Sequence, residues 1–324
     1  MPGGLGGCRP IEGIDKLRAP ARQALCRRLP VVPPNARPEP LPVLWSRDLA
    51  SRPNATFSNE RPFPVSAFRR YMSMLPEHSA VSGNWRGACD DCASCAVVGA
   101  SGSLLSHEHG ALIDAHTVVL RPNWLKIKGY EVHVGRRTTL NVIFALENML
   151  DQFIKAQRRQ PPEVRAIGLA TPSSPRGINS FFRYIGRRQL NASHPISGRA
   201  RHTDQPLFLL SDRLWERAVA HLCVATDEGC QWPTRTSIMR PSSGFFAVLV
   251  ALQTCRNVSL FGFTSDPCLP FHYYGPRPKV CLRSRKNPHK TAVPKANDEI
   301  VHWFDKEHEI YFQWQERGWL RIHS

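Results

Sequence analysis

Residues 89–105 read CDDCASCAVVGASGSLL and place three cysteines directly before a short apolar run. Cys89, Cys92 and Cys95 are equally spaced, and the run ends in the small-residue turn 99–102. Three interpretations are open: a zinc knuckle, a phosphate-binding loop, or a disulfide-anchored strand that opens a nucleotide site. Zinc knuckles need a second pair of ligands, and no obvious fourth ligand is present here.

The turn 99–102 also lacks the usual phosphate-loop signatures. Its glycines do not complete a G-x-G-x-x-G pattern, and no Gly-Lys-Ser/Thr follows them. A strand followed by small residues and a helix nevertheless leaves backbone N–H groups free to bind an anion. A tight strand-to-helix turn explains the same residues equally well, so the turn alone leaves both possibilities open.

Short apolar runs recur downstream, several of them rich in β-branched residues, and they are typical of strands buried on both faces of a parallel sheet. These runs are AVVGAS (96–101), TVVLRPN (117–123), TTLNVIFAL (138–146), EVRAIGLA (163–170), PLFLLS (206–211) and NVSLFGF (257–263). Helical stretches lie between them, notably GFFAVLVALQTC (244–255). The alternation predicts an α/β fold, a Rossmann-like, mostly parallel sheet flanked by helices.

The residue pattern of the final segment predicts an amphipathic helix. Apolar residues form one stripe at the 3.6-residue period, namely Ile300, Phe304, Tyr311 and Trp314. Gly318 is expected to end this helix, and WLRIH (319–323) reads as a closing strand.

The N-terminal part differs in character. Residues 1–62 are rich in proline and show no sustained period, which is typical of a linker. We therefore expect a poorly ordered stem over residues 1–75 and a catalytic domain over residues 76–324. No run of about 18 apolar residues is present, and the first residues lack the apolar core of a signal peptide.

The amino-acid composition indicates the cellular compartment and the kind of binding partner. The net charge of +17 favours anionic partners, but the basic residues are dispersed and no nucleic-acid-binding motif is legible. We therefore expect no nucleic-acid partner. Ten cysteines indicate an oxidising compartment. The sequons at Asn54, Asn191 and Asn257 point the same way, towards a secretory glycoprotein.

Four segments, taken in order, resemble the sialyltransferases of glycosyltransferase family 29. Residues 95–124 with HVGRRTT (133–139) are similar to the family's long L motif, and RPSSGFFAVLVALQTCRNVSLFGF (240–263) is similar to its S motif. HYYG (272–275) resembles motif III, and His302 with Glu307 matches the His-x4-Glu of the very small motif. The terminal KEHEIYFQW is most similar to the plant and algal sialyltransferase-like branch. The resemblance covers about residues 85–324 and implies a variant of the GT-A-like fold.

The resemblance also implies how the cysteines pair. The family joins the cysteine that opens the L motif to one near the end of the S-motif helix, which here means Cys95 with Cys255. Three further pairings are expected: Cys268 with Cys281, Cys223 with Cys230, and Cys92 with Cys26 or Cys8. The cysteine cluster is then a disulfide anchor.

The activity implied by the resemblance is inverting transfer of sialic acid from a cytidine monophosphate (CMP) donor to a sugar hydroxyl on a glycoprotein or glycolipid. Such a protein resides in the Golgi lumen, attached to the membrane. Chemistry of this kind needs a general base for the acceptor hydroxyl and stabilisation of the departing phosphate. No Asp-x-Asp occurs in the sequence, so we expect neither a metal nor another cofactor.

Site residues are carried over from the matching motif positions. His302 is expected to be the base, since the positive end of a helix disfavours imidazolium, and His272 should lie near the donor phosphate. Glu307 would lie about 140° away from His302 on a helix, so it is read as structural or orienting. The expected CMP-binding residues are Ser101, Asn123, Ser242, Ser243, Gly244 and Tyr273. Asp114, Arg121 and Arg137 also match the family, but they fit buried structural roles equally well.

The L motif departs from the family at one point. Ala100 stands where the family usually has a donor-contacting asparagine, and Ser103 replaces a second asparagine. Losing such a hydrogen bond typically costs on the order of 1–3 kcal/mol. Two hypotheses follow: a transferase that uses CMP-sialic acid or a related CMP-activated acid such as Kdo, or a catalytically inactive sialyltransferase-like protein that acts in binding or assembly in the secretory pathway.

Overall fold

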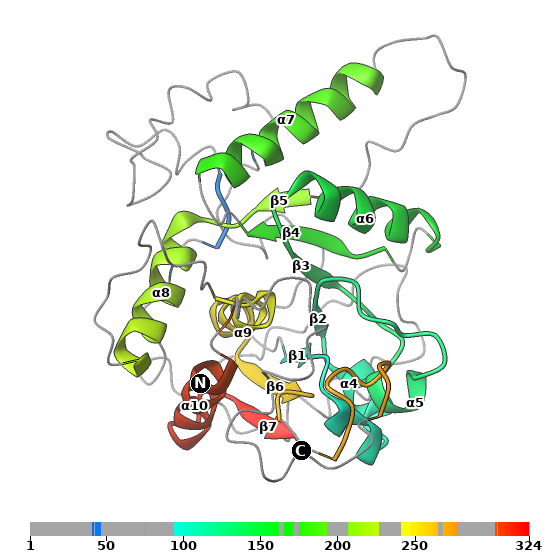
Figure 1. The fold of residues 1–324 in the computed structure, drawn as a ribbon, viewed down its shortest axis with the longest axis vertical. Coiled ribbons are helices and arrows are strands. Elements are labelled where there is room, and N and C mark those ends of the chain that lie inside the picture. The colour runs from blue at the N-terminus through cyan, green and yellow to red at the C-terminus, as the bar shows by residue number, and fades with distance from the viewer. Residues whose placement is uncertain are drawn as a thin grey trace, which may run out of the picture.

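A computed structural model describes most of the chain from residue 94 onward and a few earlier positions. The described residues are 41, 43–46, 75, 94–161, 165–171, 175–192, 207–226, 241–264, 268–277, 302 and 304–323. They contain a seven-stranded sheet in the order β5-β4-β3-β2-β1-β6-β7, flanked by helices on both faces (Figure 1). All six neighbouring pairs of strands are parallel, which confirms the predicted fold class.

Each strand falls within, or overlaps, one of the apolar runs that predicted it, including the closing strand. The strands are β1 (Ser94–Val98), β2 (Val118–Pro122), β3 (Leu140–Phe144), β4 (Ile167–Thr171), β5 (Leu207–Leu209), β6 (Asn257–Phe261) and β7 (Arg321–His323). Every residue of β1, β2, β3 and β6 is buried, as expected for strands that are covered on both faces.

The helices form two layers. They are the 3-10 helix η3 (Gly102–Ser106) and the α-helices α4 (Gly110–Ala115), α5 (Glu131–Val134), α6 (Glu147–Arg158), α7 (Pro175–Ala192), α8 (Asp212–Thr226), α9 (Ser243–Thr254) and α10 (Phe304–Glu316). Side chains alternate between the layers: Cys95 and Val97 pack with α8, α9 and α10, whereas Ala96 and Val98 pack with α4 and α5. The helix α9 is buried almost all round and lies across the centre of the sheet (Figure 1).

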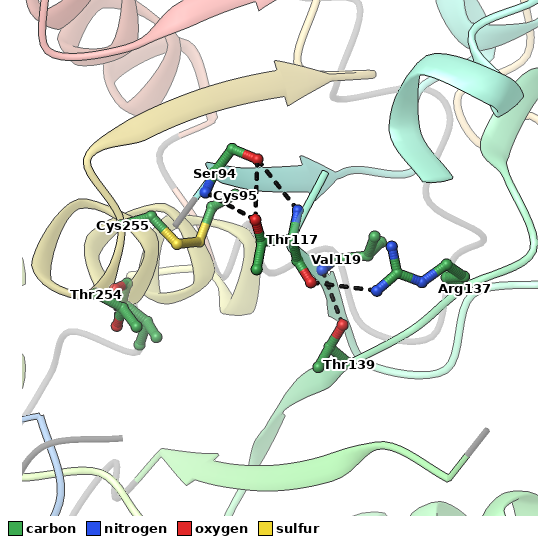
Figure 2. Close-up of a disulfide and its surroundings, with 9 residues drawn as sticks. Ser94, Cys95, Thr117, Val119, Arg137, Thr139, Thr254 and Cys255 are labelled. Carbon is green, nitrogen blue, oxygen red and sulfur yellow. Dashed lines mark hydrogen bonds between the residues drawn. A yellow bond between two sulfur atoms is a disulfide. The ribbon is translucent and has the colours of Figure 1, made fainter. Parts of the chain in front are cut away.

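The predicted disulfide between Cys95 and Cys255 is present, with a Cα–Cα distance of 5.8 Å. It joins the start of β1 to the residue that follows α9, at the edge of the sheet where the parallel strands begin (Figure 2). Next to it, Thr117 N–H donates to Ser94 Oγ (3.1 Å), and Ser94 N–H donates to Thr117 Oγ1 (3.3 Å). The disulfide and this reciprocal pair hold the beginnings of β1, β2 and β6 together, which settles the role of Cys95 in favour of the disulfide anchor.

The other predicted pairings reach residues outside the described part of the chain. Cys268 is disulfide-bonded, but its predicted partner Cys281 lies outside the described residues. The same holds for Cys230, the predicted partner of Cys223, and for Cys92. These three pairings stay predictions.

Part of the region predicted as a stem packs against the domain. Residues 43–46 are buried, and Trp45 N–H donates to the Leu209 carbonyl at 2.9 Å, while Ser211 N–H donates to the Val43 carbonyl at 2.8 Å. This segment therefore covers the outer edge of β5. The boundary predicted at residue 75 stays a prediction, since residues 47–74 and 76–93 lie outside the described residues.

One of the three sequons is not an accessible glycosylation site. Asn257 is the first residue of β6 and is only 6% exposed, so a folded chain does not present it to a glycosylating enzyme. Sequons arise by chance, and this one belongs to a buried strand. Among the described residues, no helix has the length and apolar character needed to cross a membrane.

Candidate active site

The topology of the sheet indicates where a ligand would bind. The chain runs from β1 outward through β2, β3, β4 and β5, and then returns to the other side of β1 to form β6 and β7. In open parallel sheets, ligands bind outside the carboxyl ends of the strands at such a reversal of order. The segments there are the turn 99–102 after β1 and residues 262–264 and 268–277 after β6, and described residues of all four family-like motifs meet at this edge.

Carbonyl groups from the end of β6 fix the turn after β1. The N–H of Gly99 donates to the Phe261 carbonyl (2.7 Å), and the N–H of Ser101 donates to the Gly262 carbonyl (3.3 Å). The Ser101 hydroxyl caps η3 by accepting from the N–H of Ser103 at 3.1 Å. The N–H groups of Gly99, Ser101 and Ser103 are therefore already bonded, so the turn is a tight strand-to-helix connection, and the expectation that it leaves free N–H groups for an anion is wrong at these positions.

The motif III loop supports the same turn from its other side. Gly102 N–H donates to the Pro270 carbonyl (3.1 Å), and Tyr273 N–H donates to the Ala100 carbonyl (2.9 Å). A Cβ atom at Gly102 would lie 2.1 Å from the Pro270 carbonyl oxygen, so only glycine permits this approach. Tyr273 is 1% exposed, and its hydroxyl donates to the Lys126 carbonyl. This tyrosine, predicted to bind CMP, is a buried support of the turn.

The N-terminus of α9 is held by a buried carboxylate. Ser242 is the N-cap, and its hydroxyl oxygen accepts from the Phe245 N–H at 3.0 Å. Both the N–H and the hydroxyl of Ser242 donate to Glu307 on α10, at 2.7 and 2.5 Å. Burial raises the pKa of Glu307 to about 7, although the two hydrogen bonds from Ser242 act to lower it. Glu307 is thus an orienting residue, as expected, and its partner is the S-motif turn.

Beyond that cap, the first turn of α9 faces the end of β2. The Ser243 hydroxyl donates to Asn123 Oδ1 at 3.4 Å. Asn123 has a φ of 53°, and its carbonyl accepts from the side-chain amide of Asn141. No described residue accepts a hydrogen bond from the N–H of Ser243 or Gly244. Within the described part of the chain these two N–H groups remain available at the positive end of a 12-residue helix, which is a favourable place for an anion.

The two histidines proposed for chemistry belong to one aromatic cluster. His302 lies two residues before α10 and is half-buried, with its ring 6.2 Å from Phe144 at the end of β3 and 5.3 Å from Phe304. Phe304 lies 6.1 Å from Phe271, which lies 4.7 Å from His272. Burial lowers the pKa of His272, so its neutral form is favoured. The structure places both imidazoles at the carboxyl edge of the sheet, linked by the two phenylalanines.

The remaining polar residues of the L motif are structural. Arg121 is 1% exposed and donates to the carbonyls of Val134 (2.6 Å) and Arg137 (2.9 Å). The Asp114 carboxylate accepts from the N–H groups of Arg136 and Arg137, each at 2.9 Å. Burial lowers the pKa of Arg121 to about 10, and its charge faces backbone carbonyls. Of the two readings left open, the buried structural role is the one that the contacts of these residues support.

Two supporting contacts were not predicted from the motifs. Asn141 holds the Asn123 carbonyl, and Ser103 accepts from the Thr264 hydroxyl at 3.0 Å and donates to its carbonyl at 3.3 Å. An amide inside the apolar run 138–146 is a signal that could have identified Asn141. Nothing in the sequence pairs Ser103 with Thr264, because the two are 161 residues apart.

Fold and geometry together define an α/β protein with an anion-compatible site at the carboxyl edge of a parallel sheet. The model of glycosyltransferase family 29 (sialyltransferase) matches residues 43–313, and the chain belongs to this family. This membership confirms the resemblance seen in the four motifs.

Relatives and solved structures agree with the family. The chain is 35% identical over 196 residues to sialyltransferase-like protein 3 of Oryza sativa subsp. indica, a match that covers 56% of this chain and 50% of that protein. It is 29% identical over 213 residues to the human beta-galactoside alpha-2,6-sialyltransferase 2, which covers 63% of this chain and 36% of that protein. These matches span about half or less of each relative. A mammalian sialyltransferase in complex with Gal-beta-1-3GalNAc-ortho-nitrophenol shares the fold, with a TM-score of 0.52, 17% identity and 99% coverage of both chains.

Proposed function

We propose that this chain carries a CMP-sugar-dependent glycosyltransferase site, which transfers sialic acid or a related CMP-activated acid sugar to a sugar hydroxyl with inversion. The observation that carries the proposal is the open first turn of α9, held by Glu307 beside Asn123. Membership of the sialyltransferase family supports the choice of a CMP-linked acid sugar as donor and of a glycan on a glycoprotein or glycolipid as acceptor.

Each residue then has a chemical task. The donor phosphate binds at the N–H groups of Ser243 and Gly244, where the helix dipole and two unused donors favour negative charge. The amide of Asn123 hydrogen-bonds the nucleotide. As the bond between the sugar and the phosphate breaks, His272 stabilises the departing CMP, and His302 accepts the proton of the attacking acceptor hydroxyl. Donors of these kinds suffice for a monophosphate leaving group, so we propose a reaction without a metal.

The site would work in the Golgi lumen, on a membrane-attached glycoprotein. The buried disulfide between Cys95 and Cys255 supports an oxidising compartment, since such bonds persist there and are rare in the cytosol. Fluorescence microscopy of the tagged chain beside a Golgi marker tests this, and a purely cytosolic signal would overturn it.

Calorimetric titration with CMP tests the nucleotide site directly. Wild type should bind CMP, and Asn123→Gly should bind it about tenfold more weakly, the loss expected for one hydrogen bond to a ligand. Glycine is chosen because it accepts a φ of 53° without strain. Asn148→Ala removes an exposed amide from the first turn of α6 and serves as the matched control, with unchanged CMP binding. Absence of CMP binding by the wild-type protein would refute the proposal.

The alternative function is a catalytically inactive binding or assembly protein. Ala100 favours this alternative, because it has no polar side chain that could bind a donor sugar nucleotide. The contact of Ala100 with the motif III loop is made by its carbonyl, which accepts a hydrogen bond from the Tyr273 N–H. Release of CMP from CMP-sialic acid in the presence of a β-galactoside separates the two functions. CMP binding without any release or transfer would favour the inactive protein.

A further inference from the structure

Three imidazole rings surround Phe261, the last residue of β6. Their ring centroids lie 5.4 Å (His109), 5.8 Å (His116) and 4.4 Å (His323) from that of Phe261. In each of the three, Nε2 is buried and has no hydrogen-bond partner in the described part of the chain. We call these three histidines the imidazole cage. They belong to the loop before α4, the residue after α4, and the end of β7.

The surroundings of the cage favour the neutral form of its imidazole rings. His116 is 1% exposed, and its Nδ1 lies 2.9 Å from the Leu112 carbonyl, so Nδ1 carries the proton and donates, which leaves Nε2 as a bare lone pair. Burial lowers the pKa of His116 and of His323 to about 4, and it also lowers the pKa of His109. A proton added to His116 would create a buried charge without a partner in the described part of the chain, which is unfavourable, and protonation of the half-buried His109 and His323 would add positive charge beside it.

The surroundings of the cage add positive charge and do not compensate it. Arg137 lowers the pKa of His116, and Arg321 lowers that of His323. His107 stacks on His109 with centroids 5.1 Å apart and lowers its pKa. The titratable and charged groups that face the cage from the packed elements are Arg137, Arg321, His107, His133 and Asp114. Nδ1 of His133 lies 2.8 Å from the His107 carbonyl. The Asp114 carboxylate accepts hydrogen bonds from the backbone N–H groups of Arg136 and Arg137.

The cage is linked directly to the turn after β1. The carbonyl of Phe261 accepts the N–H of Gly99, and the carbonyl of Gly262 accepts the N–H of Ser101. The residue whose ring the cage surrounds and the glycine that follows it therefore supply the two carbonyls that hold this turn. His323 is the least firmly held of the three, because β7 is a three-residue strand at the edge of the sheet and, among the described strands, pairs only with β6.

We propose that the neutral imidazole cage is a positioning element for the turn 99–102, and that protonation of the cage separates β7 from β6 and loosens this turn. His109, His116 and His323 act through Phe261 and do not touch a substrate. Release of the turn does not depend on the proposed function. Its expected consequence, weaker binding of CMP, does rest on the proposed function.

The size of the effect follows from His116 alone. Opening restores its ordinary pKa of 6.5, in place of about 4 in the closed cage. The closed form is then fully favoured above pH 6.5 and loses its advantage as the pH falls towards 4. At pH 5 the ratio of open to closed forms is about twentyfold higher than at pH 7, and protonation of His323 acts in the same direction.

Hydrogen exchange of the full chain without ligand tests the proposal. Protection factors of the Gly99 and Ser101 amides, corrected for the intrinsic pH dependence of exchange, should fall by about twentyfold or more from pH 7 to pH 5. Val97, in the middle of β1, reports on global opening and should lose less protection. Unchanged protection of Gly99 and Ser101, or an equal loss at Val97, would overturn the proposal.

Matched variants separate the cage from other histidines. His116→Asn keeps a donor for the Leu112 carbonyl, and His323→Phe keeps a ring on Phe261, but neither titrates, so the double variant should retain protection at pH 5. His221→Phe is the control: burial and nearby arginines also lower the pKa of His221 to about 4, but its ring packs on Trp314 (5.1 Å), on the opposite face of the sheet. The control should lose protection as wild type does. Equal losses in the double variant and wild type contradict the proposal.

A second measurement does not depend on the folding of any variant. Imidazole resonances of the wild-type protein should show that His116 and His323 titrate well below pH 6.5, and ordinary titration near 6.5 would overturn the cage. Calorimetry with CMP at pH 7 and pH 5 then addresses the consequence. If CMP does not bind at pH 7, the proposed function fails, while amide exchange still decides whether the cage holds the turn.

Discussion

Replacing Glu307 by glutamine should change the stability of the protein in a way that reverses with pH. Burial raises the pKa of this carboxyl to about 7 from an ordinary 4.5. Because the pKa of Glu307 is raised in the folded state, protonation of Glu307 stabilises the folded protein. This contribution is fully present below pH 4.5 and is lost as the pH rises through 7. Between pH 5 and pH 8, wild type should therefore lose about 2–3 kcal/mol of stability from this group alone.

Glutamine has nearly the same shape but does not titrate. Its oxygen can still accept the Ser242 N–H, while its amide group meets the Ser242 hydroxyl less favourably, at a cost of about 1–2 kcal/mol. At pH 5, Glu307→Gln should therefore be less stable than wild type by about that amount. At pH 8, where wild type holds a buried charge, the variant should be as stable as wild type or more so.

Urea denaturation followed by tryptophan fluorescence at pH 5, 6, 7 and 8 measures this difference. The control is Glu309→Gln on the same helix, where an exposed carboxylate pairs with Lys306 at 3.0 Å. Loss of that surface pair should cost only a few tenths of a kcal/mol. If the stability difference between Glu307→Gln and wild type is the same at pH 5 and pH 8, the buried-carboxyl reasoning is wrong.

Three further changes test the disulfide, the base and the turn. Cys95→Ser with Cys255→Ser opens a loop of 160 residues and should destabilise the chain by roughly 4–5 kcal/mol in urea denaturation, whereas a free Cys95 in non-reducing peptide maps of wild type would refute the bond. His302→Ala should lower sugar transfer about a hundredfold or more with little change in the Kd of CMP, and near-parental turnover would show that His302 is not the base. Ala100→Asn should tighten CMP binding by about 1 kcal/mol in calorimetry, and unchanged or weaker binding would mean that the restored side chain does not reach the nucleotide.

The strands and the central helix were predictable because their signals are local. A strand covered by helices on both faces needs a continuous apolar run, and each run found in the sequence overlaps one strand of the sheet. The end of α10 was predictable for the same reason, since Gly318 has a φ of 72° that suits glycine. The Cys95–Cys255 bond came from family resemblance, as spacing alone does not determine how ten cysteines pair.

What the sequence could not reveal depends on contacts between distant segments. Residues 43–46 lie in a proline-rich region without periodicity, and they are buried where they hydrogen-bond to residues 209–211 at the outer edge of the sheet. The roles of Glu307 and His323 arise because α10 and β7 return to the middle of the molecule after the sheet has reversed its order. A pattern of residue types shows which side chains suit a buried position, but it does not show which partner meets them there.

Residues 302–323 therefore bring two opposing pH dependences to one edge of the sheet. Glu307 destabilises the N-terminus of α9 as the pH rises from about 4.5 to 7, whereas His323 and His116 destabilise the turn after β1 as the pH falls from about 6.5 to 4. Below pH 6.5 two imidazoles oppose one carboxyl, so acidification weakens the site overall. Above that pH only the carboxyl still titrates, so alkalinisation weakens it as well. The two halves of the site are thus held best together at about pH 6–7. Glu307→Gln should move that optimum to higher pH, because it removes only the dependence that favours acid.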